Sequence, residues 1–134
     1  LFRFRWLAYD ADDSGRWEVY VRPFPGPGGK WQISTEGGEF ARWSADGTRL
    51  FYRDRQGGIW RVDVDTRGES FSAGRPVREL ELPSEYLGDW DVAADGSRFV
   101  VVQQGGAAGA GGPNLVKFAF NWFDEIERLL ATGR

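Results

Sequence analysis

The sequence contains no histidine and no cysteine among its 134 residues. Without histidine, the chain cannot build a Ser-His-Asp or Cys-His triad, or a zinc or iron centre with histidine ligands. Without cysteine it has no disulfide and no thiolate nucleophile or metal ligand, and such a chain fits the cytoplasm and the periplasm equally. These absences exclude most hydrolase chemistry, and we predict a chain with no catalytic residues and no cofactor.

Basic charge and long apolar stretches are also scarce. There are 17 Lys and Arg residues against 20 Asp and Glu residues, a net charge of −3. A nucleic-acid partner requires a basic face, so nucleic acid is not expected. The apolar runs are far shorter than the roughly 20 residues of a membrane helix, which predicts no membrane insertion. No signal peptide opens the chain, and because it does not begin with methionine we expect a processed chain or a fragment of a longer protein.

One pattern recurs along the chain: a strand, an Asp-Gly turn and a second strand. Residues 43–52 read WSADGTRLFY and residues 91–101 read DVAADGSRFVV, so Asp46 and Asp95 are 95 − 46 = 49 positions apart. A partial copy at residues 4–10 aligns with the strand after Asp46 at an offset of 49 − 5 = 44 positions. Repeats of about 40–50 residues made of short strands are typical of β-propeller blades. Each Asp-Gly pair predicts a hairpin turn in which both central residues take a positive φ.

The strand pattern divides the chain into three units. Residues 5–34 predict an incomplete blade of three strands, residues 39–83 a complete blade of four, and residues 87–120 another incomplete blade of three. Within the complete blade, residues 65–74 predict a polar loop and residues 76–83 an outer strand between two prolines. The sequence therefore predicts one all-β domain: a propeller fragment of about two and a half to three antiparallel four-stranded blades.

The end of the chain differs from the strands before it. Residues 121–131 predict a short amphipathic helix, with Trp122, Ile126 and Leu129 on its apolar face. A propeller closes with about four to eight blades, so this chain is either part of a longer protein or closes by pairing with another copy. Unpaired strand edges favour such association, and we predict a homo-oligomer, most simply a dimer.

The repeat resembles a known bacterial family. Residues 43–52 are similar to the W-S-P-D-G-K-x-I-x-Y repeat of TolB-type, WD-repeat-like propellers, with Ala45 and Ala94 in place of the usual proline. Residues 14–25 and 121–126 resemble the C-terminal end of propellers fused to bacterial serine/threonine protein kinases. No kinase motif is present, so kinase activity does not transfer. The resemblance implies a platform that binds a ligand or a protein.

Two sets of side chains are candidates for a site. The first matches the spacing of a calcium loop and comprises Asp10, Asp12, Ser14 and Glu18. The last position of that loop is Val21 instead of a carboxylate, so an Asx-rich hairpin is the favoured interpretation. We expect most of the aromatic side chains on strands to lie in the core. The second set contains those that are candidates to line a pocket for a peptide or a sugar, together with two arginines beside them. It comprises Trp43, Trp60, Trp90, Arg42 and Arg61.

These observations predict a non-enzymatic interaction module whose partners are another copy of the chain and a protein or peptide. Two alternatives stay open. The first is that the chain is the gating propeller of a prolyl-oligopeptidase-type peptidase, whose separate hydrolase domain would bring a Gly-x-Ser-x-Gly elbow and a histidine. A lectin-like propeller that binds carbohydrate through exposed tryptophan is the other alternative.

Overall fold

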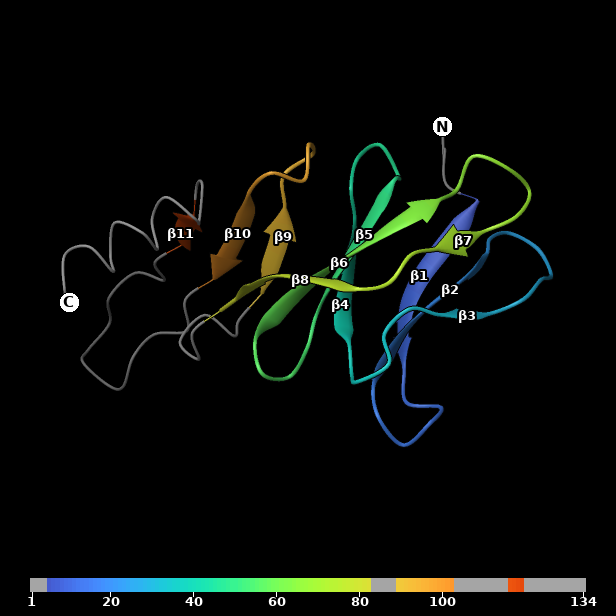
Figure 1. Cartoon of the computed structure of the whole chain (residues 1–134), viewed down its shortest axis with the longest axis horizontal. Coiled ribbons are helices and arrows are strands. Elements are labelled where there is room, and N and C mark those ends of the chain that lie inside the picture. Colours follow the sequence, from blue (N-terminus) through green and yellow to red (C-terminus); the bar gives the residue numbers. More distant parts are fainter. Residues whose placement is uncertain (1–4, 83–88, 103–115, 120–134) are drawn as a thin grey trace.

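The chain is all-β, and its antiparallel sheets are consistent with propeller blades. The computed structural model describes residues 5–82, 89–102 and 116–119, the last segment as backbone only. This part of the chain forms eleven strands in three antiparallel sheets, which follow one another across the molecule (Figure 1). The helix predicted at residues 121–131 lies outside the described residues.

The first sheet consists of β1 (Trp6–Ala11), β2 (Glu18–Pro23) and β3 (Trp31–Gln32), in that order. β1 and β2 form a hairpin that ends in an Asx-rich turn, where the Gly15 amide donates to the Asp12 carbonyl at 3.3 Å. Gly15 has a φ of 79°, a conformation that glycine adopts without steric cost. Proline at the end of β2 and in the following loop limits further pairing, which explains why β3 is short.

The second sheet consists of β4 (Glu39–Trp43), β5 (Arg49–Arg53), β6 (Gly58–Asp65), β7 (Ser72–Ala73) and β8 (Val77–Glu81). β7 and β8 both pair with the edge of β6 that faces away from β5, so together they make one interrupted outer strand. The prediction of a loop throughout residues 65–74 is therefore wrong at β7. The strand forms because Phe71 is buried in the core and brings the neighbouring backbone against β6.

The third sheet consists of β9 (Trp90–Val92), β10 (Phe99–Val102) and β11 (Val116–Ala119), with β10 in the middle. Its first two strands repeat the β4–β5 hairpin. The Ala45 amide donates to the Ala94 carbonyl at 3.3 Å, so the two Asp-Gly turns lie side by side. These turns are the adjacent loops above β5 and β9 in Figure 1.

The second sheet is buried on both faces because its strands are apolar in both directions. Leu50 and Tyr52 of β5 point toward the first sheet, and Phe51 between them points toward the third. The core between the first and second sheets contains Trp6, Val19, Val21, Ile33, Leu50, Tyr52, Val62, Val64 and Phe71. The core between the second and third sheets contains Phe51, Ile59, Leu80, Leu82, Trp90, Phe99 and Val101. The face-to-face stacking of sheets thus follows directly from alternation along β5 and β6.

Both Asp-Gly turns have a geometry that differs from the prediction. The Gly47 amide donates to the Ser44 carbonyl at 2.9 Å, and Gly96 donates to Ala93 at 2.8 Å. Only the glycines take a positive φ, 71° and 72°. The expectation of two central residues with positive φ is wrong, because the Asp46 carboxylate accepts hydrogen bonds from the Thr48 amide and hydroxyl and holds the aspartate on the ordinary side of φ.

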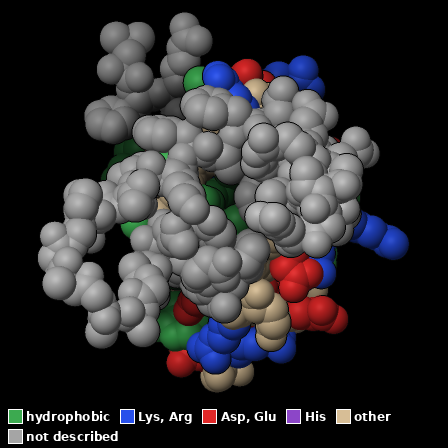
Figure 2. All heavy atoms as spheres, turned by 90° about the vertical axis from the view of Figure 1, so that its left-hand side faces the viewer, with side chains coloured by type: hydrophobic (Ala, Val, Ile, Leu, Met, Phe, Trp, Pro, Cys, Tyr) green, Lys and Arg blue, Asp and Glu red, His purple; other side chains and the backbone are tan. Residues whose placement is uncertain are grey.

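Positively and negatively charged side chains both lie on the surface. Figure 2 shows the side of the molecule at the left of Figure 1, where Lys and Arg lie next to Asp and Glu along the lower part. Within the described residues there is no helix that is both long and apolar enough to cross a membrane.

Candidate ligand-binding pocket

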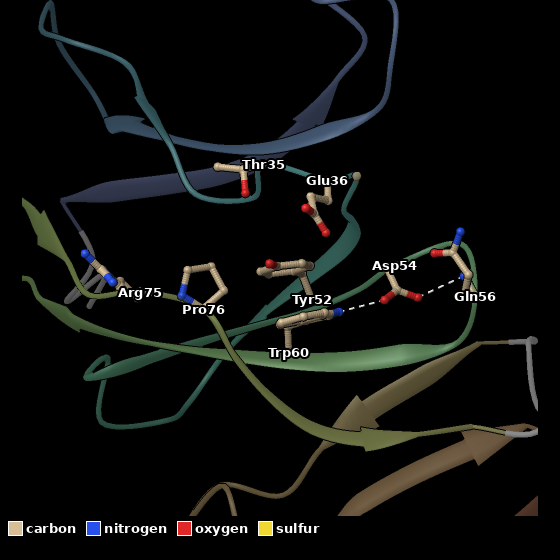
Figure 3. Close-up of a pocket in the computed structure, with 9 residues that line it drawn as sticks. Thr35, Glu36, Tyr52, Asp54, Gln56, Trp60, Arg75 and Pro76 are labelled. Carbon is tan, nitrogen blue, oxygen red and sulfur yellow. Dashed lines mark hydrogen bonds between the residues drawn. The ribbon is translucent and has the colours of Figure 1, made fainter.

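A pocket of about 420 Å³ opens between the first and second sheets. Its walls come from the loop after β3, from the β5–β6 hairpin and from the break between β7 and β8 (Figure 3). The lining residues are Thr35, Glu36, Gly37, Tyr52, Asp54, Gln56, Trp60, Arg75 and Pro76. Three segments that are far apart in the sequence therefore build one site.

Stacked aromatic rings form the floor of the pocket. Tyr52, Trp60 and Arg78 are direct neighbours across β5, β6 and β8, so they form a row on one face of the sheet. The Tyr52 and Trp60 rings are parallel to within 7°, with their centroids 6.4 Å apart. The Arg78 guanidinium lies 5.9 Å from the Trp60 ring. Because Trp60 is the middle member of the row, its two faces are taken by Tyr52 and Arg78.

Asp54 fixes the indole of Trp60. One carboxylate oxygen accepts hydrogen bonds from the backbone amides of Gln56 and Gly58, at 2.9 and 2.8 Å. The other accepts from the Trp60 Nε1 at 2.7 Å (Figure 3). A Cβ at Gly58 would lie 2.5 Å from this carboxylate, so the turn requires glycine. Asp54 therefore has three donors and acts as a structural support for the floor.

A buried carboxylate holds the loop above the floor. Glu18 is 0% exposed and accepts a hydrogen bond from the Ser34 hydroxyl. It also accepts from the Gly37 amide, at 3.1 and 3.2 Å, and pairs with the Arg16 Nε at 2.8 Å. The Ser34 oxygen in turn accepts from the Val19 amide at 2.8 Å. Charge and hydrogen bonds are thus both satisfied, and the loop of residues 35–37 is fixed to the first sheet.

The hydroxyl group of Tyr52 is the polar group that the floor leaves without a partner. The residue is only 3% exposed, and no hydrogen bond joins its hydroxyl to any residue that the structure describes. In Figure 3 the hydroxyl lies on the side of Thr35 and Pro76. The residue is buried but its hydroxyl oxygen is not among the fully buried polar atoms, so this group is open to the pocket and can bind a ligand atom or water.

The electrostatic surroundings keep this hydroxyl protonated. Burial is the main reason that the pKa of the Tyr52 phenol lies well above its ordinary value. The negative charges of Glu18, Asp54 and Glu36 raise this pKa further. At neutral pH the group is therefore a neutral O–H that can donate a hydrogen bond.

Three of the four side chains of the calcium candidate hold the hairpin and its neighbours, and Asp12 contributes its backbone carbonyl to the turn. Asp10 accepts a hydrogen bond from the Phe40 amide at 2.7 Å, and the Ser14 hydroxyl donates to the Arg16 carbonyl at 3.2 Å. Glu18 is occupied inside the first sheet, as described above. No group of three or more acidic side chains in the described part of the chain is placed to hold a metal ion. The choice between a calcium loop and an Asx-rich hairpin stays a prediction for this segment.

Of the residues predicted to contact a ligand, Trp60 lines this pocket. Trp43 packs partly buried against the first core, and Trp90 is buried in the second. Arg42 lies 5.9 Å from the Trp90 ring and 3.4 Å from Asp89. Arg61 pairs with Glu79 and Asp63. Ligand binding by these four residues stays a prediction, and each has a packing or ion-pair role in the structure.

A second pocket of about 420 Å³ lies beside the proline-rich loop after β2. Its walls are mostly apolar, and its charged residues are Arg5 and Glu69. Trp6 lines it, and its buried Nε1 has no hydrogen-bond partner among the described residues. The Tyr52 pocket has in addition a stacked floor held by Asp54 and a carboxylate, Glu36, with no partner in the described part of the chain, so it is the stronger candidate site.

Comparison with known proteins finds one similar solved structure and no similar sequence. No protein-family model and no curated protein matches the sequence. A crystal structure of a protein from Lactobacillus plantarum, a structural genomics target, is similar over 76% of this chain and 34% of that one. The identity is 16% and the TM-score 0.38. The assignment to the all-β class accordingly rests on the strands and sheets of this chain.

Proposed function

We propose that the chain is a non-enzymatic interaction module of the β-propeller type that binds a protein or peptide segment in the Tyr52 pocket. The TolB-like repeat and the succession of antiparallel sheets support a propeller. The observation that carries the binding role is the unpartnered hydroxyl of Tyr52, which belongs to a largely buried side chain at the base of a pocket of about 420 Å³. This volume falls within the range of roughly 300–1,000 Å³ that is usual for ligand pockets.

The geometry favours a peptide over the carbohydrate of a lectin-like role. Sugars bind tryptophan by stacking on an open ring face, whereas Tyr52 and Arg78 take the two faces of Trp60. A peptide needs no open face, because its amide groups are satisfied by hydrogen-bonding groups in a pocket. Tyr52, Glu36 and Thr35 supply such groups.

The binding role can be tested by selecting peptides from a random display library on the full chain. The affinities of the selected peptides are then measured by calorimetry for the wild type and for Thr35→Trp, which fills the mouth of the pocket from an exposed position. We expect Thr35→Trp to weaken binding about tenfold or more, as loss of a buried contact area does. Ser70→Trp, also exposed and outside the pocket, is the matched control and should bind normally.

Two results would contradict this proposal in different ways. A library that yields no binder would argue against a binding module. Peptides that bind Thr35→Trp as tightly as the wild type would move the binding surface away from the Tyr52 pocket.

We further propose that the chain associates with a second copy of itself, and the free edge of β1 supports this proposal. The Phe24 amide donates to the Arg5 carbonyl at 2.8 Å, which fixes the hydrogen-bonded pairs of the β1–β2 ladder. Alternate residues of a strand point their backbone groups in opposite directions, so Trp6, Ala8 and Asp10 direct theirs away from β2. Among the described residues no strand pairs with this edge of β1. An edge of this kind accepts a strand from another chain.

Ala8→Pro tests this association because it removes an amide from the free edge and none from the β1–β2 ladder. Sedimentation equilibrium should show an oligomer for the wild type and for Ala8→Ser, and a monomer for Ala8→Pro. A wild-type chain that is monomeric at all concentrations would refute self-association, whatever the variants do.

A further inference from the structure

We infer that the Tyr52 pocket recognises a peptide segment that presents a backbone carbonyl to the Tyr52 hydroxyl and a lysine or arginine side chain to Glu36. This inference rests on the proposed function and specifies the chemistry of its ligand.

The hydroxyl selects a neutral acceptor. As a neutral O–H, Tyr52 can donate to a carbonyl or to a carboxylate. A ligand carboxylate beside it would be repelled by the charges of Glu18 and Asp54, which are close enough to perturb the phenol itself. A peptide carbonyl carries no net charge and avoids this repulsion. The backbone of a peptide is therefore the acceptor that fits best.

The acidic groups around the pocket differ in whether they are already satisfied. Glu18 is paired with Arg16, and Asp54 accepts three hydrogen bonds. Glu36 is exposed at the rim, and no hydrogen bond or ion pair joins its carboxylate to the described residues. Glu36 is therefore the acidic group that can bind a cation from a ligand.

Arg75 lies on the other side of the pocket, which separates the two signs of charge. In Figure 3 Pro76 stands between Arg75 and Tyr52, and Glu36 lies beyond Tyr52 near Asp54. A cationic side chain that enters beside Glu36 consequently avoids Arg75. An acidic side chain directed to Arg75 is the competing arrangement, and it predicts the opposite preference.

The test uses blocked pentapeptides, acetyl-Gly-Gly-X-Gly-Gly-amide, in which X is Lys, Arg, Leu or Glu. Each is titrated into the full chain while the indole N–H signal of Trp60 is followed by NMR, because this group belongs to the floor. We expect saturable shifts, with the Lys and Arg peptides binding about fivefold more tightly than the Leu peptide, the size of an exposed ion pair. The Glu peptide should bind most weakly.

Two substitutions separate the two contacts. Glu36→Gln should reduce the affinity of the Lys peptide to that of the Leu peptide. Glu69→Gln is the control and should leave the affinity of the Lys peptide unchanged. Tyr52→Phe should weaken all four peptides about three- to tenfold through loss of one hydrogen bond, and Tyr9→Phe is its control. Tyr52→Phe should fold as stably as the wild type, because the hydroxyl it removes has no partner in the described part of the chain.

The outcomes distinguish this inference from the proposed function. A Glu peptide that binds as well as the Lys peptide, or Tyr52→Phe with unchanged affinities, would overturn the inference. Peptides that shift other signals but not Trp60 would overturn it while leaving a binding module in place. If no peptide in this set or in the display library binds, both fail.

Discussion

The two interfaces of the second sheet have different chemistry, although one strand supplies both. Toward the third sheet β5 presents Phe51, which meets Phe99 edge to face at 5.5 Å in an apolar core. Toward the first sheet it presents Tyr52, which lies near the buried Glu18 and at the base of the pocket. Alternation along β5 thus gives a purely apolar side chain to one interface, and both an apolar and a polar side chain, Leu50 and Tyr52, to the other.

The position of the polar groups also differs. Between the second and third sheets, Arg42 pairs with Asp89 at 3.4 Å and Asp91 at 3.8 Å, and both carboxylates are largely exposed. Between the first and second sheets, Glu18 and Ser34 lie inside the structure. Exposed ion pairs contribute little stability, whereas buried polar groups fix geometry when all are satisfied. Both interfaces have an apolar core, but only the interface between the first and second sheets also holds buried, hydrogen-bonded polar groups beside a pocket.

Phe51→Ala should have the largest effect, because it opens a cavity in the apolar interface. Phe51 is 1% exposed, and such truncations cost about 3–5 kcal/mol. Urea denaturation followed by tryptophan fluorescence measures the change, with Leu7→Ala at an exposed site as the control. A loss below about 1 kcal/mol would contradict a stabilising role for this interface.

Glu18→Gln should have a smaller effect on stability and a specific effect on the pocket. It removes a charge from Arg16 and presents an amide where the Gly37 and Ser34 donors point, which costs about 2 kcal/mol. Hydrogen exchange should show faster exchange at Gly37, since its amide loses the charged carboxylate and one of its two acceptor oxygens. Glu69→Gln should change neither quantity, and exchange at Gly37 that stays slow would refute the role given to Glu18.

Gly96→Ala tests whether the two turns between the second and third sheets are conformationally restricted. The φ of 72° disfavours any side chain, and the new Cβ would lie 3.0 Å from an Arg49 nitrogen. We expect a loss of about 1–2 kcal/mol in the free energy of unfolding. Gly68→Ala, where φ is ordinary and the space is open, should be neutral. Equal stability of the two variants would contradict the turn geometry.

The smallest expected effect is the loss of stability at low pH when Asp46 is protonated. Hydrogen bonds from the Ser44 hydroxyl and then from the Thr48 amide and hydroxyl lower the pKa of Asp46 to about 2. Because this pKa is depressed on folding, the stabilisation is fully present above the unfolded value near 3.8 and is lost as pH falls through about 2. Asp95 has a lowered pKa through Ser97 but lacks an equivalent of the Ser44 donor. Carboxyl NMR titration should therefore find Asp46 more acidic than Asp95, and the reverse order would contradict this account.

The sequence was sufficient to predict the strands and the repeat, because alternation and the 49-residue offset are local or periodic signals. It did not predict β7, since Ser72 and Ala73 have the composition of a loop and pair only because Phe71 is buried beside them. The turn type was also wrong, because the Asp46 side chain bonds to the backbone in a way that the dipeptide alone does not reveal.

The pocket was beyond sequence reasoning for a similar reason. Trp60 was a candidate, but its stacking with Tyr52 depends on the register between β5 and β6. Glu36 and Arg75 come from segments that meet only when the first and second sheets pack together. A signal did exist for Tyr52, because it ends the repeated motif in line with Trp60 across a hairpin of predictable length.

The break between β7 and β8 has a consequence for how the specificity of this site can evolve. Arg75 and Pro76 lie in that break, and neither takes part in the pairing of the outer strand with β6. Substitution there changes the charge and shape of one wall without removing a ladder hydrogen bond or a core side chain. Tyr52 and Trp60, in contrast, are tied to the core and to Asp54. The pocket therefore joins a floor that is fixed by the core to a wall whose residues can be substituted without loss of sheet pairing.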